Sequence, residues 1–507
     1  MPRKIALALA PALIMLALLV ALRAGGPPAS AAGATAVSAS LDHTCAVTAA
    51  GGAKCWGSNN FGQLGDGTIM PRTVPVDVSG LTSGVAAISA GEYHTCALLT
   101  SGGVKCWGGN FKGQLGDGTM LDSHAPVDVM TLSSGVTAIA AGGNHTCART
   151  SAGGAKCWGD NVDAQLGDGT FADRLTPTDV SGLTVGVATV AAGRYHTCAL
   201  TTGGGVKCWG HNFLGQVGNG SSPGYVMLPA NVTGLSSGVA SIDLGAFHTC
   251  AVTTGGAAKC WGTNVNGQLG DGTTTMRSTP VAVSGLGASV TGISGGRYHS
   301  CASMAAGGVK CWGGNDSGQL GVSSTTELCG TPPQPCSTTP ADVQDLAGVK
   351  ASLGTGWHHS CALPYSGVLQ CWGANGTGQL GDGSGMDRLA PVAVSGMGAK
   401  ELPTPTETLT PTETPTPTVT LTPSSTATPT PTNTPTPPPP CPGDITGDLV
   451  VTVTDIAEVV AHFGHSQAAD PSKWAAHEDA RRDLNGDGAI TAGDIALVVA
   501  EYGSVCS

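Results

Sequence analysis

The repeat that organises this chain first appears as HTCAVTAAGGAKCWG at residues 43–57. Nine residues separate Cys45 from Cys55, with His43 two residues before the first cysteine and Trp56 directly after the second. Cysteine and histidine this close together occur in metal sites, redox sites and disulfide staples. Six edited copies follow, and the first cysteines of successive copies lie 51, 51, 51, 52, 51 and 60 residues apart.

Each copy contains about four short apolar or alternating runs, separated by Gly, Asn, Asp and Ser. Examples are the strand-like VPVDVSGL (74–81) and GVAAISAGEYHTCAL (84–98), and the turn-rich NNFGQLGDGT (59–68). A period near 50 with several short strands is typical of propellers, in which each repeat is one four-stranded blade that must stack on its neighbours. The sequence therefore predicts an all-β, seven-bladed β-propeller over residues 33–400.

The cysteine spacing predicts a hairpin staple. Cys45 and Cys55 are equidistant from a Gly-rich turn centred near Ala50, so they face each other across an antiparallel pair, within disulfide range. The predicted intra-blade pairs are Cys45–Cys55, Cys96–Cys106, Cys147–Cys157, Cys198–Cys208, Cys250–Cys260, Cys301–Cys311 and Cys361–Cys371. The alternative is a metal site that includes His43, but a structural zinc needs four ligands and no fourth is supplied in each repeat.

The histidine and tryptophan columns each have two interpretations. The histidines are His43, His94, His145, His196, His248, His299 and His359. They either tie strands together by hydrogen bonds or form a functional ring at the channel. The tryptophans are Trp56, Trp107, Trp158, Trp209, Trp261, Trp312 and Trp372. They either pack beside the disulfides or line a binding face.

Two features depart from the repeat and are candidates for surface contacts. Trp357 stands outside the tryptophan column, within GWHHSC. The sixth copy carries an insertion at 327–337, in which we expect Cys329–Cys336 to close a protruding loop.

The N-terminal segment and the number of cysteines point to export. Residues 1–31 combine a basic start, an apolar run from Ile5 to Leu22 and an Ala-Ser-Ala cleavage site, as in a secretory signal peptide. The apolar run also reaches the lower limit for a membrane span, so a membrane anchor is the alternative if the segment is not cleaved. The 18 cysteines are an even number, as expected in an oxidising compartment. The formal net charge of −12 disfavours nucleic acid as a partner.

Residues 401–440 form a Thr/Pro tract without apolar periodicity, which predicts an extended linker, either bare or O-glycosylated. Residues 441–507 then contain a duplication, TDIAEVVAHFG (454–464) and GDIALVVAEYG (493–503), each preceded by an acidic loop. The second loop places oxygen ligands at the spacing that Ca²⁺ requires, with Gly488 at the sharp turn. Its predicted ligands are Asp483, Asn485, Asp487, Ala489 (backbone carbonyl), Thr491 and Asp494.

The first loop is a weaker match, because Thr446 replaces Asn and Leu449 replaces the turn glycine. Its predicted ligands are Asp444, Thr446, Asp448, Val450 (backbone carbonyl), Thr452 and Asp455.

Two family resemblances follow from these motifs. The phrases G-x-x-H-[TS]-C-A, C-W-G-x-N and G-Q-L-G-D-G resemble the regulator-of-chromosome-condensation repeat family, whose members form seven-bladed propellers. The regular cysteine pairing is a departure from its intracellular members. The paired calcium loops after a Thr/Pro linker resemble a dockerin, a small all-α, EF-hand-related domain that folds around Ca²⁺ and binds a cohesin.

The dockerin resemblance assigns partner choice to Val453, Thr454, Ala492 and Gly493, at positions 10 and 11 of the two loops. These residues differ from the Ser/Thr pairs of well-known dockerins. Because paired units bring the ends of such a module together, we also expect Cys441–Cys506 to form a disulfide.

The sequence is compatible with three functions. The first is a secreted, non-catalytic propeller that binds a protein or glycan and is held on a scaffold or cell surface through its dockerin. The second is an extracellular polysaccharide hydrolase or lyase, although the acidic residues that break the repeat pattern, such as Asp243 and Glu327, are isolated in sequence, and Glu92 lies in a variable position. The third, nucleotide exchange or chromatin binding, is disfavoured by export, acidity and disulfides. No catalytic residue is assigned.

Overall fold

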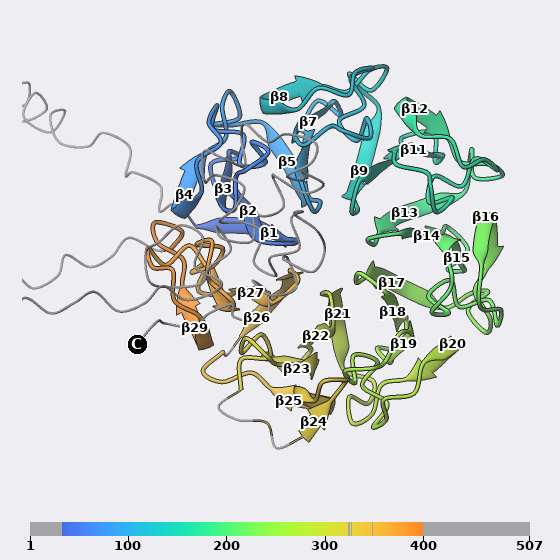
Figure 1. Cartoon of the computed structure of the whole chain (residues 1–507), viewed down its shortest axis with the longest axis vertical. Coiled ribbons are helices and arrows are strands. Elements are labelled where there is room, and N and C mark those ends of the chain that lie inside the picture. The colour runs from blue at the N-terminus through green and yellow to red at the C-terminus, as the bar shows by residue number, and fades with distance from the viewer. Residues whose placement is uncertain (1–32, 323–324, 326, 347, 399–507) are drawn as a thin grey trace, which may run out of the picture. The chain divides into compact units, whose positions relative to one another are not determined.

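The computed structural model describes residues 33–322, 325, 327–346 and 348–398. Within them the strands form seven antiparallel sheets around a central channel (Figure 1). The first strand of each sheet contacts the first strand of both neighbouring sheets, so these strands line the channel. The prediction of an all-β, seven-bladed propeller is confirmed.

Consecutive strands form each blade from the channel outward. The first strands are β1 (Ala34–Ala39), β5 (Val85–Ala90), β9 (Val136–Ala141), β13 (Val187–Ala192), β17 (Val239–Leu244), β21 (Val290–Gly295) and β26 (Val349–Thr355). The second strands are β2 (His43–Thr48), β6 (His94–Leu99), β10 (His145–Thr150), β14 (His196–Thr201), β18 (His248–Thr253), β22 (His299–Met304) and β27 (His359–Pro364).

The third strands carry the second cysteine and the tryptophan of each copy. They are β3 (Ala53–Gly57), β7 (Val104–Gly108), β11 (Ala155–Gly159), β15 (Val206–His211), β19 (Ala258–Gly262), β23 (Val309–Gly314) and β28 (Gln370–Gly373). The fourth strands are β4 (Arg72–Asp77), β8 (Ser123–Asp128), β12 (Arg174–Asp179), β16 (Tyr225–Asn231), β20 (Arg277–Ala282), β25 (Gln334–Asp342) and β29 (Arg388–Ala393). Blade 6 gains an outer strand, β24 (Glu327–Cys329), which pairs with β25.

The hydrophobic core lies between the blades. Seven clusters of buried side chains each join the cysteine pair of one blade to the tryptophan of the next. The same contact closes the ring, because Trp56 of blade 1 packs with Cys361 and Cys371 of blade 7. Blade 7 consists of its own four strands, so side-chain packing and hydrogen bonds, without an exchanged strand, join the first blade to the last.

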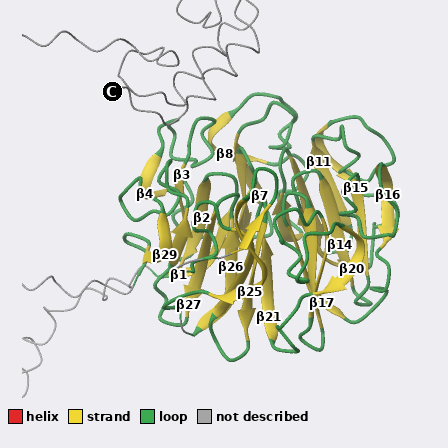
Figure 2. Cartoon of the chain, turned by 60° about the horizontal axis from the view of Figure 1, so that its bottom comes forward, coloured by secondary structure: helices red, strands yellow, loops and turns green. Residues whose placement is uncertain are grey.

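The up-and-down order of the strands places the loops on two opposite faces, as Figure 2 shows. Loops between first and second strands, and those between third and fourth strands, lie on one face, which we call the mouth face. Turns between second and third strands, and the connections between blades, lie on the other.

Several predictions fall outside the described residues. They are the signal segment 1–31, the linker 401–440, the module 441–507 with its two calcium loops, and Cys441–Cys506. Within the described part of the chain, no helix is long and apolar enough to cross a bilayer.

Candidate functional site

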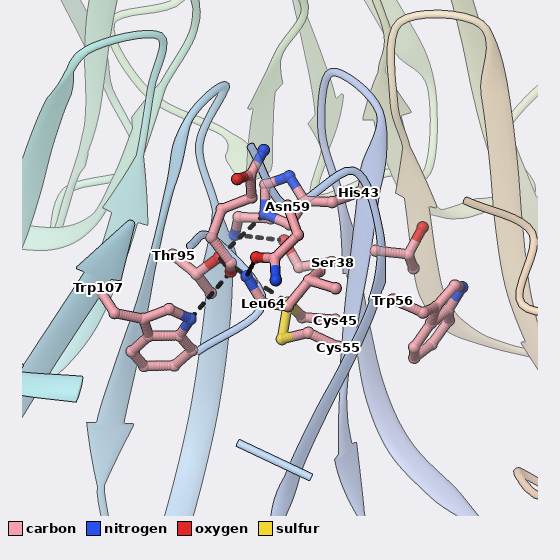
Figure 3. The surroundings of a disulfide bond; sticks show 12 residues. Ser38, His43, Cys45, Cys55, Trp56, Asn59, Leu64, Thr95 and Trp107 are labelled. Carbon is pink, nitrogen blue, oxygen red and sulfur yellow. Dashed lines mark hydrogen bonds between the residues drawn. A yellow bond between two sulfur atoms is a disulfide. The ribbon is translucent and has the colours of Figure 1, made fainter. Parts of the chain in front are cut away.

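The cysteines of the repeat are joined within each blade. All seven predicted intra-blade pairs form disulfides between the second and third strands, with Cα–Cα distances of 4.0–4.1 Å. Figure 3 shows the first of them, Cys45–Cys55, beside Trp107 of the next blade. Since both sulfur atoms of each pair are bonded to each other and fully buried, the metal alternative does not apply to these pairs. The repeat cysteines therefore join two strands of one blade and pack in its interface with the next blade.

The histidine column ties neighbouring blades together. His43 Nε2 lies 2.9 Å from the Thr95 hydroxyl of the next blade, and that hydroxyl donates to the main-chain carbonyl of Gln63 at 2.9 Å. Because the hydroxyl's only proton is committed to Gln63, the histidine must donate from Nε2. The same arrangement recurs at every interface, including His359 with Thr44 at the ring closure.

Burial keeps these imidazoles neutral. It lowers the pKa of His43 to about 4 and that of His94 to about 3, and all seven side chains are inaccessible to solvent. The Nδ1 atoms are buried without hydrogen-bond partners among the described residues. The histidines therefore lie between the blades and do not form a ring of accessible groups in the channel.

The tryptophan column is also structural. Trp107 is fully buried, and its indole N–H donates to the same Gln63 carbonyl at 2.9 Å. Gly65 lies against the indole with φ of +70°, and a Cβ there would approach Trp107 Nε1 to 2.6 Å. The G-Q-L-G phrase therefore supplies one carbonyl and one bare backbone position to seat the next blade's tryptophan.

A different set of residues gathers at the channel mouth. Glu92, Arg194, Arg297 and Trp357 belong to blades 2, 4, 6 and 7, in the loops that join first and second strands. The Arg194 Nε lies 3.0 Å from Glu92 Oε1, although blades 2 and 4 are not neighbours. The guanidinium carbons of Arg194 and Arg297 lie 4.7 and 4.2 Å from the Trp357 ring centroid. Together these side chains line a cavity of about 270 Å³ that runs into the channel.

The environment of the mouth also shifts the pKa values of two carboxyl groups. Burial raises the pKa of Glu92 to about 7, against the opposing effects of Arg194 and of a hydrogen bond from Trp357. Burial likewise raises the pKa of Asp42, which lies near His358 and Arg297. Trp357, which the sequence marked as a surface contact, is half-buried in this cluster. Its arginine partners were not identified from the sequence, although the residue two before each histidine varies among copies.

Aromatic side chains are concentrated on the mouth face around this cluster. Tyr93 packs edge-on against Phe61 at 5.1 Å, and Phe213 packs against Tyr225 at 5.0 Å. The Tyr, Phe and non-repeat Trp residues in mouth-face loops or at strand ends beside them are Phe61, Tyr93, Phe111, Phe171, Tyr195, Phe213, Tyr225, Phe247, Tyr298 and Trp357. Of the Tyr and Phe residues that the structure describes, Tyr365 alone lies on the opposite face. This asymmetry marks the mouth face as the candidate ligand-binding surface.

The insertion of blade 6 folds onto the same face. Cys329 and Cys336 form a disulfide, and the main-chain N–H of Asn315 donates to Pro335 at 2.8 Å. The two off-pattern acids have structural partners. Glu327 accepts a hydrogen bond from the Thr338 N–H at 2.7 Å, and Asp243 accepts from the Gly295 N–H of the next blade at 3.0 Å. Ser38 and Ser89 accept the equivalent bonds in other blades, so Asp243 occupies a structural position.

Comparison with known proteins agrees with this architecture. Two profiles described as the regulator of chromosome condensation (RCC1) repeat match the chain. The first covers 34–63, 85–114, 136–165, 187–216, 239–268 and 290–319, and the second covers 55–98, 101–149, 157–200 and 260–303. The ultraviolet-B receptor UVR8 of Arabidopsis thaliana is 31% identical over 367 residues, which cover 71% of this chain and 81% of the receptor. The chain belongs to the RCC1 repeat family.

Two further matches either cover a smaller part of the matched protein or have a lower sequence identity to this chain. The human E3 ubiquitin-protein ligase HERC2 is 33% identical over 62% of this chain, but the match spans only 7% of the ligase. The structure of yeast RCC1 (Prp20) bound to Kap60 superposes with a TM-score of 0.60 at 22% identity, over 72% of this chain and 85% of that one. This structural likeness shows the fold alone.

The C-terminal region matches a second family, the dockerin type I domain, at residues 442–501. This match contains both predicted calcium loops and the predicted partner-choice residues Val453, Thr454, Ala492 and Gly493. The chain thus combines an RCC1-type propeller with a dockerin type I domain.

Proposed function

We propose that this protein is a secreted, non-catalytic binding module. Its propeller holds a protein or glycan ligand on the mouth face, and its dockerin attaches the module to a cohesin-bearing scaffold or cell surface. The observation that carries the proposal is the concentration of aromatic side chains on one face of a propeller that is joined to a dockerin type I domain. Aromatic groups supply large contact areas at little entropic cost.

The attachment is proposed to depend on calcium. Carboxylate, amide and hydroxyl oxygens at positions 1, 3, 5, 9 and 12 of the loop beginning at Asp483 are the hard donors that Ca²⁺ prefers. Bound Ca²⁺ would fix this loop and so present Ala492 and Gly493 to the cohesin. The Thr/Pro tract 401–440 then serves as a spacer between the attachment point and the propeller.

The test is a pull-down from the native culture surface with the full chain as bait, with and without a calcium chelator. Chelation should release a cohesin-bearing scaffold and leave the propeller's ligand bound. The variant Asp487→Ala should lose the scaffold, whereas Asp448→Ala in the weaker loop should lose less of it. Retention of the scaffold under chelation would count against the dockerin assignment.

One observation favours the alternative, an extracellular polysaccharide hydrolase or lyase. Glu92 and Asp42 at the mouth both have raised pKa values, a property shared with catalytic acids. Glu92 is nevertheless already held by Arg194 and Trp357, which is also how a structural carboxylate behaves. Sugar release from a polysaccharide panel that disappears in Glu92→Gln would replace the non-catalytic proposal with the enzymatic one.

A further inference from the structure

The insertion of blade 6 builds a cleft against blade 5. β24 and β25 pair as a hairpin closed by Cys329–Cys336, and the turn at its tip reaches blade 5. At that contact Gly330 has φ of +81°, and a Cβ on it would lie 3.1 Å from Asn266 Oδ1. On its other side Asn266 lies against Gly314, where a Cβ would approach its Nδ2 to 3.2 Å. Two glycines of blade 6 therefore leave room for the Asn266 amide of blade 5.

The cleft has a volume of about 580 Å³, within the usual range of small-molecule sites. Its walls combine the half-buried ring of Tyr298 with apolar Val265 and Pro332 and with the polar side chains of Asn266, Thr274 and Gln334. Among the residues that the structure describes, the two amides, the Thr274 hydroxyl and the Tyr298 hydroxyl form no side-chain hydrogen bonds to protein. These groups are free to bind a ligand.

The lining contains no charged side chain. Arg297 packs on the Tyr298 ring at 4.8 Å, at the edge of the cleft and outside its lining. A charged ligand would lose its hydration in the cleft without contacting an opposite charge in the lining, which is unfavourable. An uncharged ligand with hydroxyl groups at its edge avoids this cost, since an amide both donates and accepts hydrogen bonds. A pyranose ring has this chemistry, because one C–H face can lie on an aromatic or proline ring while its hydroxyls reach amides.

Aromatic rings continue from the cleft across the mouth face. Tyr298 stacks with Phe247 at 6.2 Å between ring centroids, and Phe247 lies 5.8 Å from Tyr195. This row crosses blades 6, 5 and 4 and would support further sugar units of the same chain. The arrangement favours a polymer over a free monosaccharide.

We propose that the cleft between blades 5 and 6 binds one unit of an uncharged polysaccharide, with Tyr298 as the platform and Asn266 and Gln334 as hydrogen-bonding partners. This inference rests on the proposed binding function and names its ligand class. The charged mouth cluster borders the cleft, because Arg297 packs on the Tyr298 ring, but the polymer need not enter the channel.

Affinity electrophoresis of the full chain in gels containing xyloglucan, galactomannan or mixed-linkage β-glucan tests the proposal, with polygalacturonate as the charged comparison. At least one neutral polymer should retard the protein, and chelation of calcium should not change the retardation. Tyr298→Ala should weaken binding at least tenfold, Tyr298→Phe less, and Asn266→Ala several-fold. Tyr365→Ala, which removes an exposed ring from the opposite face, is the matched control and should bind normally.

Thermal unfolding of each variant separates loss of the site from loss of the fold. The inference is overturned if no neutral polymer retards the protein, if Tyr298→Ala binds as Tyr365→Ala does, or if polygalacturonate binds best. In each case the pull-down tests the broader binding function separately. That function still holds if the full chain captures a ligand from the culture surface and Phe213→Ala loses it. Failure of the scaffold pull-down alone would overturn the dockerin attachment and leave the cleft unaffected.

Discussion

Residues at the interfaces between blades repeat from copy to copy, whereas residues at the mouth face vary. At each interface the same disulfide, tryptophan and histidine recur, because seven equivalent contacts must add up to a closed ring. At the mouth, the residue two before each histidine varies, with six residue types in seven blades: Leu41, Glu92, Gly143, Arg194, Ala246, Arg297 and Trp357. Repetition therefore marks what holds the ring together, and variation marks what is free to recognise a ligand. Changes at the interfaces should cost stability, and changes at the mouth should cost binding.

Acidification should have the largest effect, because it acts on all seven interfaces at once. Each buried histidine has a folded-state pKa below its unfolded value, so the unfolded chain binds more protons as the pH falls. Stability should fall below about pH 6.5, by up to about 1.4 kcal/mol per histidine per pH unit, until the folded-state pKa is reached. Denaturant unfolding between pH 7.5 and 5 measures this slope. A pH-independent stability over this range would show that the histidines are accessible and not locked between blades.

Removing one interface tryptophan should have the next largest effect. Trp158→Ala empties a fully buried site beside Cys96 and Cys106 and should lower the free energy of unfolding by about 3–5 kcal/mol. Trp357→Ala, at the half-buried mouth, should cost less than half as much. Equal losses in guanidinium unfolding would erase the distinction between interface and mouth.

Removing one blade disulfide should cost less than removing a tryptophan. Cys147→Ser combined with Cys157→Ser should lower the free energy of unfolding by about 3 kcal/mol at most, as expected for a loop of this length. The matched change at Cys329 and Cys336 should cost less, because that pair lies outside the seven inter-blade clusters. It should instead abolish polysaccharide retardation, which the Cys147/Cys157 variant should preserve when folded.

The smallest effect is expected from Glu92→Gln. Because its folded-state pKa is raised to about 7, Glu92 makes stability fall as the pH rises from about 4.5 to 7, opposite in sign to the histidines. The variant should therefore show a steeper rise of stability with pH, by at most one proton, and should match the wild type most closely at the acidic end of this range and exceed its stability near pH 7. An unchanged slope would mean that Glu92 is ionised throughout this range, held by Arg194.

Much of the fold was predictable because the repeat encodes it locally. The constant spacing of Cys45 and Cys55 places them opposite each other on a hairpin, and the copy number of that hairpin gives the number of blades. The candidate site was harder to predict from the sequence. Trp357 departs from the repeat in sequence, but Arg194 and Arg297 come from other blades, and their spacing in sequence gives no sign that they contact Trp357. Asp243 looked like an isolated acid, and only the neighbouring strand reveals its Gly295 partner.

The sequence by itself determined the repeat, the hairpin pairing of the cysteines, the seven-bladed propeller and the dockerin type I match, because each depends on spacing within one copy or one motif. The tertiary structure decided which face carries the aromatic residues, which side chains meet over the channel and where the blade 6 insertion comes to lie. The physical reason is ring closure, since it brings loops from distant copies to a common centre. Contacts across that centre depend on the geometry of the whole ring and leave no periodic trace in the sequence.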